Sequence, residues 1–419
     1  MKDQLNKKIT KPIRVVKFGG TSVASTERLT AIAHRIQKLS PHFHIIIVVS
    51  AMSGVTNQLV SFCDHMAPNL KDEEVDVVLA SGEQVTSGLL SLKLKSMGIK
   101  SCSLMSWQFK LLTSLNPTQA RIEDMDANYL LSLLLSDTIP VIAGFQGINQ
   151  DQRTTTLGRG GSDTTAVAVA AAVQNRLLEL SNEVDIMCDI YTDVDGIYTA
   201  DPRFVRKARK LTTIPAPFML ELAQAGSKVL HPRSVQLALK HNVNVRVLSS
   251  FKNDEDNEGT LIDHTKDNFM ENSYIYGIAH QQNEYLLNIN GSVLNIQKIL
   301  KEINGLYIHS DLLTLNSKDD RMHLTCMILD RDVANLKKYF EKEATDIEYS
   351  VATNKVKITL VGVGLQNDCD ILNKIYKCCD HLNVVIDLLS VTELKISLVV
   401  DQSFTISLLQ KLHEVFIES

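Results

Sequence analysis

Residues 139–173 combine a short apolar run, two glycine-bearing loops and an alanine-rich helical segment. The apolar run is typical of a β-strand that ends at Gly144, and Ser162 and Asp163 are expected to begin a helix as its cap and first-turn acid. Glycines allow backbone N–H groups to approach a ligand, and a helix N-terminus adds partial positive charge. The segment therefore predicts a strand, a loop and a helix arranged around a small anion.

Two charged residues lie among these glycines. Arg159 can form a bidentate pair with a carboxylate or phosphate, and Asp163 can accept hydrogen bonds from an ammonium group. Because a free amino acid carries both a carboxylate and an ammonium group, this loop offers a partner to each. The alternative interpretation is an ordinary glycine-rich connection between a strand and a helix.

Length and charge narrow the class of protein. A chain of 419 residues is too long for one typical core, which predicts two or three domains. The net charge is −5, and no block of Lys and Arg suits nucleic acid or an anionic membrane surface. The longest apolar run, residues 166–173, is far shorter than the roughly 20 residues of a membrane-spanning helix. We therefore expect no nucleic-acid partner and no membrane partner.

Cysteine and histidine usage indicates neither disulfides nor a metal site. The seven cysteines form no CxxC pair, and none of the twelve histidines has a zinc-ligand spacing, although His231 lies close to other chemically active motifs. Residues 1–14 are polar and lack the apolar segment of a signal peptide. These features predict reduced thiols, no protein-held metal and a cytoplasmic location.

Up to about Leu261, short β-branched runs alternate with helix-period segments, the pattern of a layered α/β domain. Between the first two expected strands, apolar residues recur with a period of 3.6, which predicts a helix with one buried face. These apolar residues are Leu29, Ile32, Ala33, Ile36 and Leu39. The expected strands are residues 13–17, 45–49, 141–143, 184–191 and 243–248.

The C-terminal part of the chain contains an internal repeat. Residues 251–273 are acidic and low in apolar residues, which predicts a linker. Beyond them, residues 300–313 resemble residues 376–389, and each copy continues to an apolar strand that ends in aspartate, at Asp330 and Asp401. Two ferredoxin-like βαββαβ units of about 70 residues fit this pattern. Such units serve as regulatory or dimerisation modules.

The segment VVKFGGTSVAS, residues 15–25, suits a polyphosphate. A strand delivers Lys17, and Gly19, Gly20 and Ser22 then supply bare backbone and hydroxyl donors. The segment has neither the glycine order of a P-loop nor that of a dinucleotide fold, so both of those sites are disfavoured.

Three other motifs lie at strand ends or helix starts, and a fourth lies next to the last of them. SAMSGVTN, residues 50–57, places hydroxyl groups around a turn. In LASGEQVTSGLL, Ser81 is expected to cap a helix, and Glu83 is either a first-turn acid or a partner for an ammonium group. DIYTDVDGIYTADPR, residues 189–203, combines acidic, aromatic and basic residues that can hold a nucleotide, and GSKVLHP, residues 226–232, adds Lys228 at a turn.

Taken in order, the motifs at residues 15–25, 50–57, 144–166, 189–203 and 226–234 resemble those of the aspartokinases. These enzymes of the amino-acid-kinase fold phosphorylate the side-chain carboxylate of L-aspartate, and the repeated tail resembles their paired ACT domains. The resemblance implies an α/β protein with a three-layer αβα catalytic domain followed by two ferredoxin-like ACT domains. The implied boundaries are 12–262 for the kinase domain, 263–282 for a linker and first regulatory strand, and 283–353 and 354–419 for the ACT domains.

The resemblance also implies the site residues. Lys17 would neutralise the transferring phosphoryl group, Asp193 would orient the lysines, Arg159 would hold the α-carboxylate, and Glu83 with Asp163 would hold the ammonium group. Positions that match the family's ATP site are Lys17, Gly19, Gly20, Ser22, Thr192, Asp193, Tyr198, Arg203, Lys228 and Val229. Positions that match its aspartate site are Thr56, Glu83, Phe145, Arg159, Gly160, Gly161, Ser162 and Asp163.

The expected chemistry needs no general base, because a carboxylate acceptor with a pKa near 4 is already ionised. Positioning and charge neutralisation by Lys17, backbone N–H groups and nucleotide-borne Mg²⁺ would suffice. The product, 4-phospho-L-aspartate, would begin the synthesis of lysine, threonine and methionine.

The repeated C-terminal units bear on regulation and on assembly. Residues 288–295 and 363–370 lack the Pro-Gly loop of feedback-controlled members, whereas residues 385–400 are similar to the family's segment near its effector site. Feedback by lysine or threonine is thus left open. We expect a homodimer or a dimer of dimers, because the apolar strands of the repeat need pairing partners.

Two alternatives compete with aspartate kinase activity. One is a kinase of the same fold that acts on glutamate or acetylglutamate, against which residues 153–163 and the paired tail argue. The other is a catalytically silent amino-acid sensor, against which the intact Lys17, Arg159, Asp163 and Asp193 argue.

Overall fold

The computed structural model describes residues 8–68, 70–253, 256–264, 273–305, 310–318, 321–343 and 347–418. The chain forms two compact units. The first unit comprises Met1–Ile197, Lys210–Ala223 and Lys228–Asn268, and the second comprises Tyr198–Arg209, Gln224–Ser227 and Phe269–Ser419. Residues 265–272, which the sequence places in a linker, lie outside the described part of the chain.

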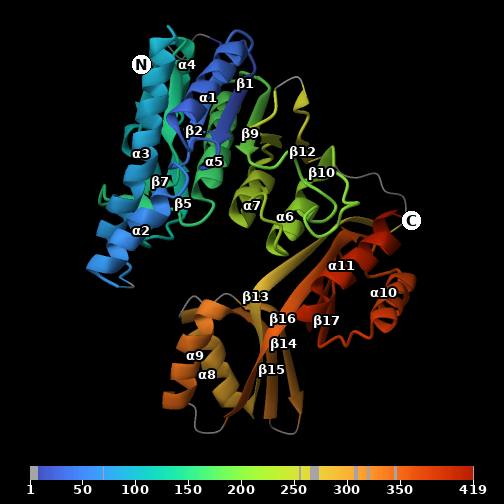
Figure 1. Ribbon diagram of the computed structural model, residues 1–419. Helices are drawn as coiled ribbons and strands as arrows, with labels where there is room; N and C mark the ends of the chain where they lie inside the picture. The colour runs from blue at the N-terminus through green and yellow to red at the C-terminus, as the bar shows by residue number, and fades with distance from the viewer. Residues whose placement is uncertain are drawn as a thin grey trace. The chain divides into compact units, whose positions relative to one another are not determined.

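The first unit is built on an eight-stranded sheet in the order β10-β12-β11-β9-β1-β2-β6-β3, with every neighbouring pair parallel except β11 and β12 (Figure 1). The five expected strands are confirmed as β1, β2, β6, β9 and β11, with ends shifted by one or two residues. The strand bounds are β1 (Ile13–Phe18), β2 (His44–Val49), β3 (Ser101–Leu104), β6 (Ile139–Ala143), β9 (Ile186–Thr192), β10 (Thr213–Pro215), β11 (Val245–Ser249) and β12 (Thr260–Asp263).

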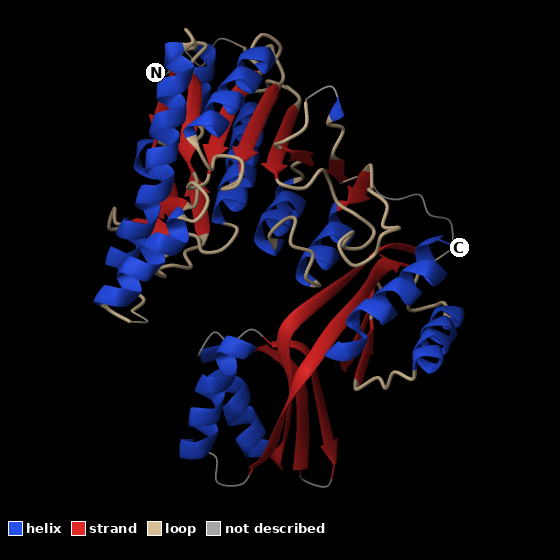
Figure 2. Ribbon diagram, in the orientation of Figure 1, coloured by secondary structure: helices blue, strands red, loops and turns tan. Residues whose placement is uncertain are grey.

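Helices cover both faces of this sheet, which confirms the three-layer αβα architecture (Figure 2). On one face, α1 buries its predicted apolar stripe in a core shared with α3, and Leu39 is the half-buried end of that stripe. On the other face, α5 is buried almost all round, which explains its small, alanine-rich sequence. The helix bounds are α1 (Thr26–Leu39), α2 (Val55–Met66), α3 (Glu73–Ser96), α4 (Asn128–Leu135), α5 (Gly161–Glu179), α6 (Ala216–Gln224) and α7 (Pro232–His241).

A second, four-stranded sheet lies in the same unit in the order β5-β4-β7-β8. Its strands are too short for apolar alternation to be visible in the sequence, and we did not expect them. Their bounds are β4 (Leu111–Thr113), β5 (Ile122–Met125), β7 (Gln146–Ile148) and β8 (Thr154–Thr156).

The second unit contains one six-stranded antiparallel sheet in the order β14-β15-β13-β16-β18-β17. Two βαββαβ-like halves share this sheet, and α8 with α9 pack on one half and α10 with α11 on the other, as the repeat predicts. The strand bounds are β13 (Tyr274–Ser292), β14 (Ser310–Lys318), β15 (Arg321–Leu329), β16 (Ile347–Val363), β17 (Leu388–Val391) and β18 (Lys395–Asp401). The helix bounds are α8 (Val293–Gly305), α9 (Asp330–Glu343), α10 (Cys369–Leu382) and α11 (Thr405–His413).

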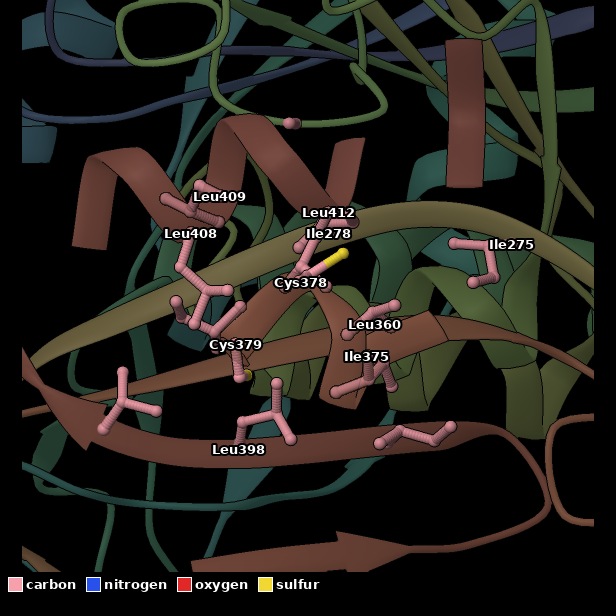
Figure 3. Packing of buried hydrophobic residues seen from close by; sticks show 14 of the residues in the cluster. Ile275, Ile278, Leu360, Ile375, Cys378, Cys379, Leu398, Leu408, Leu409 and Leu412 are labelled. Carbon is pink, nitrogen blue, oxygen red and sulfur yellow. The ribbon is translucent and has the colours of Figure 1, made fainter. Parts of the chain in front are cut away.

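The two halves exchange a strand. The first part of β13, residues 274–281, pairs with residues 357–363 of β16, and a register shift follows between Gln281 and Glu284. Ile275 and Ile278 thereby enter the core of the C-terminal half, against α10 and α11 (Figure 3). Residues that precede the first repeat in sequence thus complete the second repeat in space.

Two segments from the kinase part of the sequence, residues 198–209 and 224–227, also belong to the second unit. Residues 198–209 leave the first unit after Ile197, and Ala200 and Val205 lie in the same apolar core as α10 and α11. His413 of α11 is fully buried, and its Nε2 lies 2.9 Å from the Thr199 hydroxyl. Among the helices that the structure describes, none is long and apolar enough to cross a membrane.

Candidate active site

The carboxyl ends of the central parallel strands meet at one edge of the large sheet. Phe18 of β1 lies opposite Val49 of β2 and Tyr191 of β9, and Val49 lies opposite Ala143 of β6. The loops that follow these strands carry most of the residues predicted from the motifs. Ligands of open α/β sheets bind at such an edge.

Lys17 is the central cation of this edge. Its side chain is 10% exposed, and its Nζ lies 2.5 Å from Oδ1 of Asp163 in the first turn of α5. Gly19 follows closely, because a Cβ atom there would lie 3.3 Å from the Lys17 ammonium. The sequence assigned the orientation of the lysines to Asp193, whereas the structure places Asp163 against Lys17.

Buried hydrogen bonds fix the turn that follows Lys17. Ser22 is fully buried, its Oγ lies 2.5 Å from Oγ of Ser250, and the N–H groups of Ser22 and Val23 both donate to the Gly19 carbonyl. Gly20 approaches Ala51, whose carbonyl oxygen would lie 3.2 Å from an added Cβ. Bare backbone therefore lines this side of the site.

Glu83 is a buried carboxylate with one open oxygen. Its Oε1 accepts a hydrogen bond of 3.0 Å from the Ala51 N–H, and its Oε2 has no hydrogen-bond partner among the described residues. Burial raises the pKa of Glu83 from 4.5 to about 7, because the charged form loses its hydration. A buried, unpaired carboxylate oxygen is costly unless a ligand supplies its partner.

The structure corrects the expected surroundings of Glu83. The helix begins ten residues earlier, with Asp72 as its cap, so Glu83 lies in the middle of α3 and is not a first-turn acid. Ser81 is not a cap, since its hydroxyl donates to the Val78 carbonyl. The start of this helix was predicted too late because the first turns of α3 are acidic and look like an exposed loop in the sequence.

The glycine loop before α5, residues 157–161, has a left-handed backbone at two positions. Gly158 has φ of 75° and Gly160 has φ of 70°, and Gly160 caps the helix. Ser162 is therefore a buried residue inside the helix, where we expected the cap, whereas Asp163 is the first-turn acid that we expected. Arg159, in the middle of the loop, is exposed and has no hydrogen bond or ion pair with the residues that the structure describes.

Phe145 closes one side of this loop. Its φ of 69° is unusual for a residue with a side chain and costs conformational energy. The carbonyl of Phe145 accepts from the Leu157 N–H at 2.8 Å, and its ring would lie 2.7 Å from a Cβ on Gly161. The strained backbone thus presses the aromatic ring against the start of α5.

The remaining predicted residues divide between the two units. Thr56 is half-buried in the first turn of α2, and the Thr192 hydroxyl donates to Oδ1 of the exposed Asp193 at 3.2 Å. Lys228 is exposed and Val229 half-buried just before α7. Tyr198 and Arg203 belong to the second unit, where Arg203 pairs with Asp201 at 2.6 Å. Across the described residues, no group of three or more His, Cys, Asp or Glu side chains is arranged to hold a metal ion.

Comparison with known proteins shows the family of the chain. Residues 12–249 match the model of the amino acid kinase family. Over 407 residues the chain is 37% identical to an aspartokinase of Rickettsia conorii, with 96% of this chain and 98% of that protein covered. The chain belongs to the aspartokinases. It is also 36% identical over 410 residues to an aspartate kinase of Stutzerimonas stutzeri, with 96% of each covered.

The fold likewise matches an aspartokinase. The structure of E. coli aspartokinase III in complex with aspartate and ADP superposes with a TM-score of 0.78 at 23% identity, and the match covers 97% of this chain and 100% of that one. The resemblance seen in the motifs is therefore confirmed at the level of family and fold.

Proposed function

We propose that this aspartokinase transfers the γ-phosphoryl group of ATP to the side-chain carboxylate of L-aspartate, giving 4-phospho-L-aspartate. The observation that carries the proposal is the buried Lys17 beside Asp163, at the sheet edge and on the first turn of α5. In the same unit, Oε2 of Glu83 and the guanidinium of Arg159 have no hydrogen-bond partner among the residues that the structure describes. These charges match the two substrates. Lys17 offers a cation to the phosphoryl group, and Arg159 offers a cation to the carboxylate of aspartate. Glu83 and Asp163 offer carboxylates to its ammonium group.

Aspartate binds, in this proposal, at the loop before α5. Arg159 pairs with the α-carboxylate, and Glu83 and Asp163 accept from the ammonium group. Thr56 and Ser162 supply hydroxyl groups and Phe145 forms a wall. The backbone at Gly160 and Gly161 lets the substrate approach the helix N-terminus.

The nucleotide lies along the turn formed by Gly19, Gly20 and Ser22, with its terminal phosphate toward Lys17. Asp193 has exposed carboxylate oxygens, which suit a water of nucleotide-bound Mg²⁺, and the metal would supply further charge neutralisation. Further contacts to the nucleotide stay predictions at Thr192, Tyr198, Arg203, Lys228 and Val229.

A change of partner by Lys17 explains how the anionic phosphoryl group and the anionic acceptor carboxylate can approach each other. In this structure, the ammonium of Lys17 neutralises Asp163. When both substrates are present, Lys17 turns to the γ-phosphoryl group, and Asp163 takes the ammonium group of aspartate. The acceptor carboxylate is already ionised, so no residue has to remove a proton. The low exposure of Lys17 strengthens its interaction with the developing charge.

The activity is tested by trapping the acyl phosphate with hydroxylamine, using L-aspartate, L-glutamate and N-acetylglutamate in parallel. We expect hydroxamate from aspartate, dependent on ATP and Mg²⁺, at a rate at least about tenfold above that with either other acceptor. Product from glutamate or acetylglutamate would instead identify a kinase of the same fold with another substrate. Aspartate binding without any hydroxamate would identify a sensor.

Assembly and regulation are proposed from the second unit. We expect a homodimer or dimer of dimers formed through the ACT-like halves, with an amino-acid effector from the product pathways of lysine, threonine or methionine. Sedimentation at micromolar concentration is expected to give at least a dimer, and a monomer would contradict the assembly. Titration of the hydroxamate assay with the three amino acids identifies the effector. The cytoplasmic location stays a prediction.

A further inference from the structure

The glycine loop before α5 rests on the turn that begins α7. Arg233, in the first turn of this helix, donates from Nη1 to the Leu157 carbonyl at 2.5 Å and from Nη2 to the Ala120 carbonyl at 3.0 Å. Both oxygens belong to the backbone, and Arg233 is half-buried. One planar guanidinium therefore connects Leu157, at the start of the loop that carries Arg159, to Ala120.

His231 supports the next residues of the same loop. It caps α7, and its Nδ1 accepts from the Arg233 N–H at 3.3 Å. A Cβ atom on Gly160 would lie 2.2 Å from Cβ of His231, so the histidine packs directly against the left-handed glycine. Burial and the charges of Arg233 and Arg159 lower the pKa of His231, whereas Asp163 opposes them, so the imidazole is neutral at neutral pH and free to accept.

Other contacts anchor the beginning of the loop without Arg233. The Thr156 hydroxyl donates to the buried Asp76 at 2.5 Å, and the Ala120 N–H donates to the Thr156 carbonyl at 2.9 Å. Leu157 donates its N–H to Phe145. Loss of Arg233 is therefore expected to displace the middle of the loop and to leave the sheet and α5 folded.

We infer that Arg233 is a positioning residue for aspartate, which acts with His231 to fix residues 157–161 and thereby the place where Arg159 meets the α-carboxylate. This inference rests on the proposed function. Arg233 acts through the loop in this inference and does not touch substrate; its Nη1 and Nη2 donate to backbone carbonyls. Lysine cannot replace it, since an ammonium group lacks the planar fork that reaches both oxygens.

The test compares Arg233→Lys with wild type. We expect KM for aspartate to rise about tenfold or more and KM for ATP to stay within about twofold, because small displacements of a positioning group weaken one substrate selectively. His231→Asn keeps a capping side chain but removes the ring, and we expect the same selectivity from it. In Arg233→Ala, millimolar guanidinium is expected to restore part of the aspartate affinity.

Arg176→Lys is the matched control. Arg176 is also half-buried and also has two polar partners, Asn128 and Glu179, but it lies in the last turn of α5, away from the loop. We expect neither KM to change in this variant. Thermal melts show whether each variant is folded.

Calorimetric binding of aspartate gives the same comparison without turnover. If both Arg233→Lys and His231→Asn bind aspartate as wild type does, or if KM for aspartate and ATP rise together, the positioning role is overturned. Wild-type protein that binds aspartate but makes no hydroxamate contradicts the proposed function, while weaker binding by the variants still supports the inference. Absence of aspartate binding by wild type overturns both.

Discussion

Replacing Lys17 with methionine is expected to lower kcat by about 10³-fold and to leave the protein folded. Methionine has a similar length and keeps the packing around β1, but it offers no charge to the γ-phosphoryl group. The effect is expected mainly in kcat, since the need for this charge is greatest as the phosphoryl group transfers. The measurement is steady-state hydroxamate formation at saturating ATP and aspartate.

Two variants serve as controls for Lys17→Met. Lys38→Met removes an exposed lysine from the last turn of α1 and is expected to keep wild-type turnover. Lys17→Arg keeps the charge but changes its shape, so partial activity is expected. Wild-type kcat in Lys17→Met would refute the role of the ion pair between Lys17 and Asp163.

The second large effect is expected from Glu83→Gln, which should weaken aspartate use and stabilise the ligand-free protein. Removing one partner of a buried ammonium–carboxylate pair costs several kcal/mol, so kcat/KM for aspartate is expected to fall by about 10²-fold or more at pH 8. Glutamine retains the oxygen that accepts from Ala51. The loss therefore reports on the open Oε2.

The stability change depends on pH, because burial raises the pKa of Glu83 from 4.5 to about 7. A carboxyl group with a raised pKa in the folded state favours folding at low pH, and this contribution is lost as pH rises from 4.5 through about 7. Above that pH, the folded protein carries the full cost of the buried charge, about 3 kcal/mol. Glu83→Gln is therefore expected to raise Tm at pH 8 and to change it little at pH 4.5.

Aspartate binding should follow the same titration. Wild type is expected to bind aspartate less tightly below pH 7, where Glu83 takes up a proton, and Glu83→Gln should lack this dependence. Glu74→Gln, at the exposed start of the same helix, is the control and should alter the free energy of unfolding by less than about 1 kcal/mol. A lower Tm for Glu83→Gln at pH 8 would contradict the cost assigned to the buried charge.

The large sheet and the site edge could be predicted from the sequence, because parallel strands are continuous apolar runs and the glycine motifs directly follow them. The partner of Lys17 could not. Asp163 and Asp193 both follow strands in the sequence, and only the packing of α5 against β1 decides between them. Glu83 was ambiguous for a similar reason, because an acid in the middle of a helix carries no local sign that its oxygen is buried.

The role of Arg233 could not be predicted from the motif that contains it and His231. The sequence drew attention to His231, but the role of Arg233 depends on the carbonyl groups of Leu157 and Ala120, which any residue would supply. The exchange of residues 274–281 between the ACT-like halves was equally invisible. Their apolar alternation is compatible with either half, and only the register of two long strands assigns them.

Because residues 198–209 pack in the second unit, the kinase domain is hard to produce as a separate fragment. A fragment that stops at Asp263 would retain Tyr198 and Arg203 but would lose α10 and α11, the helices that shelter Ala200 and Val205. It would also lack His413, the neighbour of Thr199. A single cut at Asp263 therefore leaves residues 198–209 without their core, and mutations in α10 or α11 are expected to disturb a segment that the kinase part of the sequence encodes.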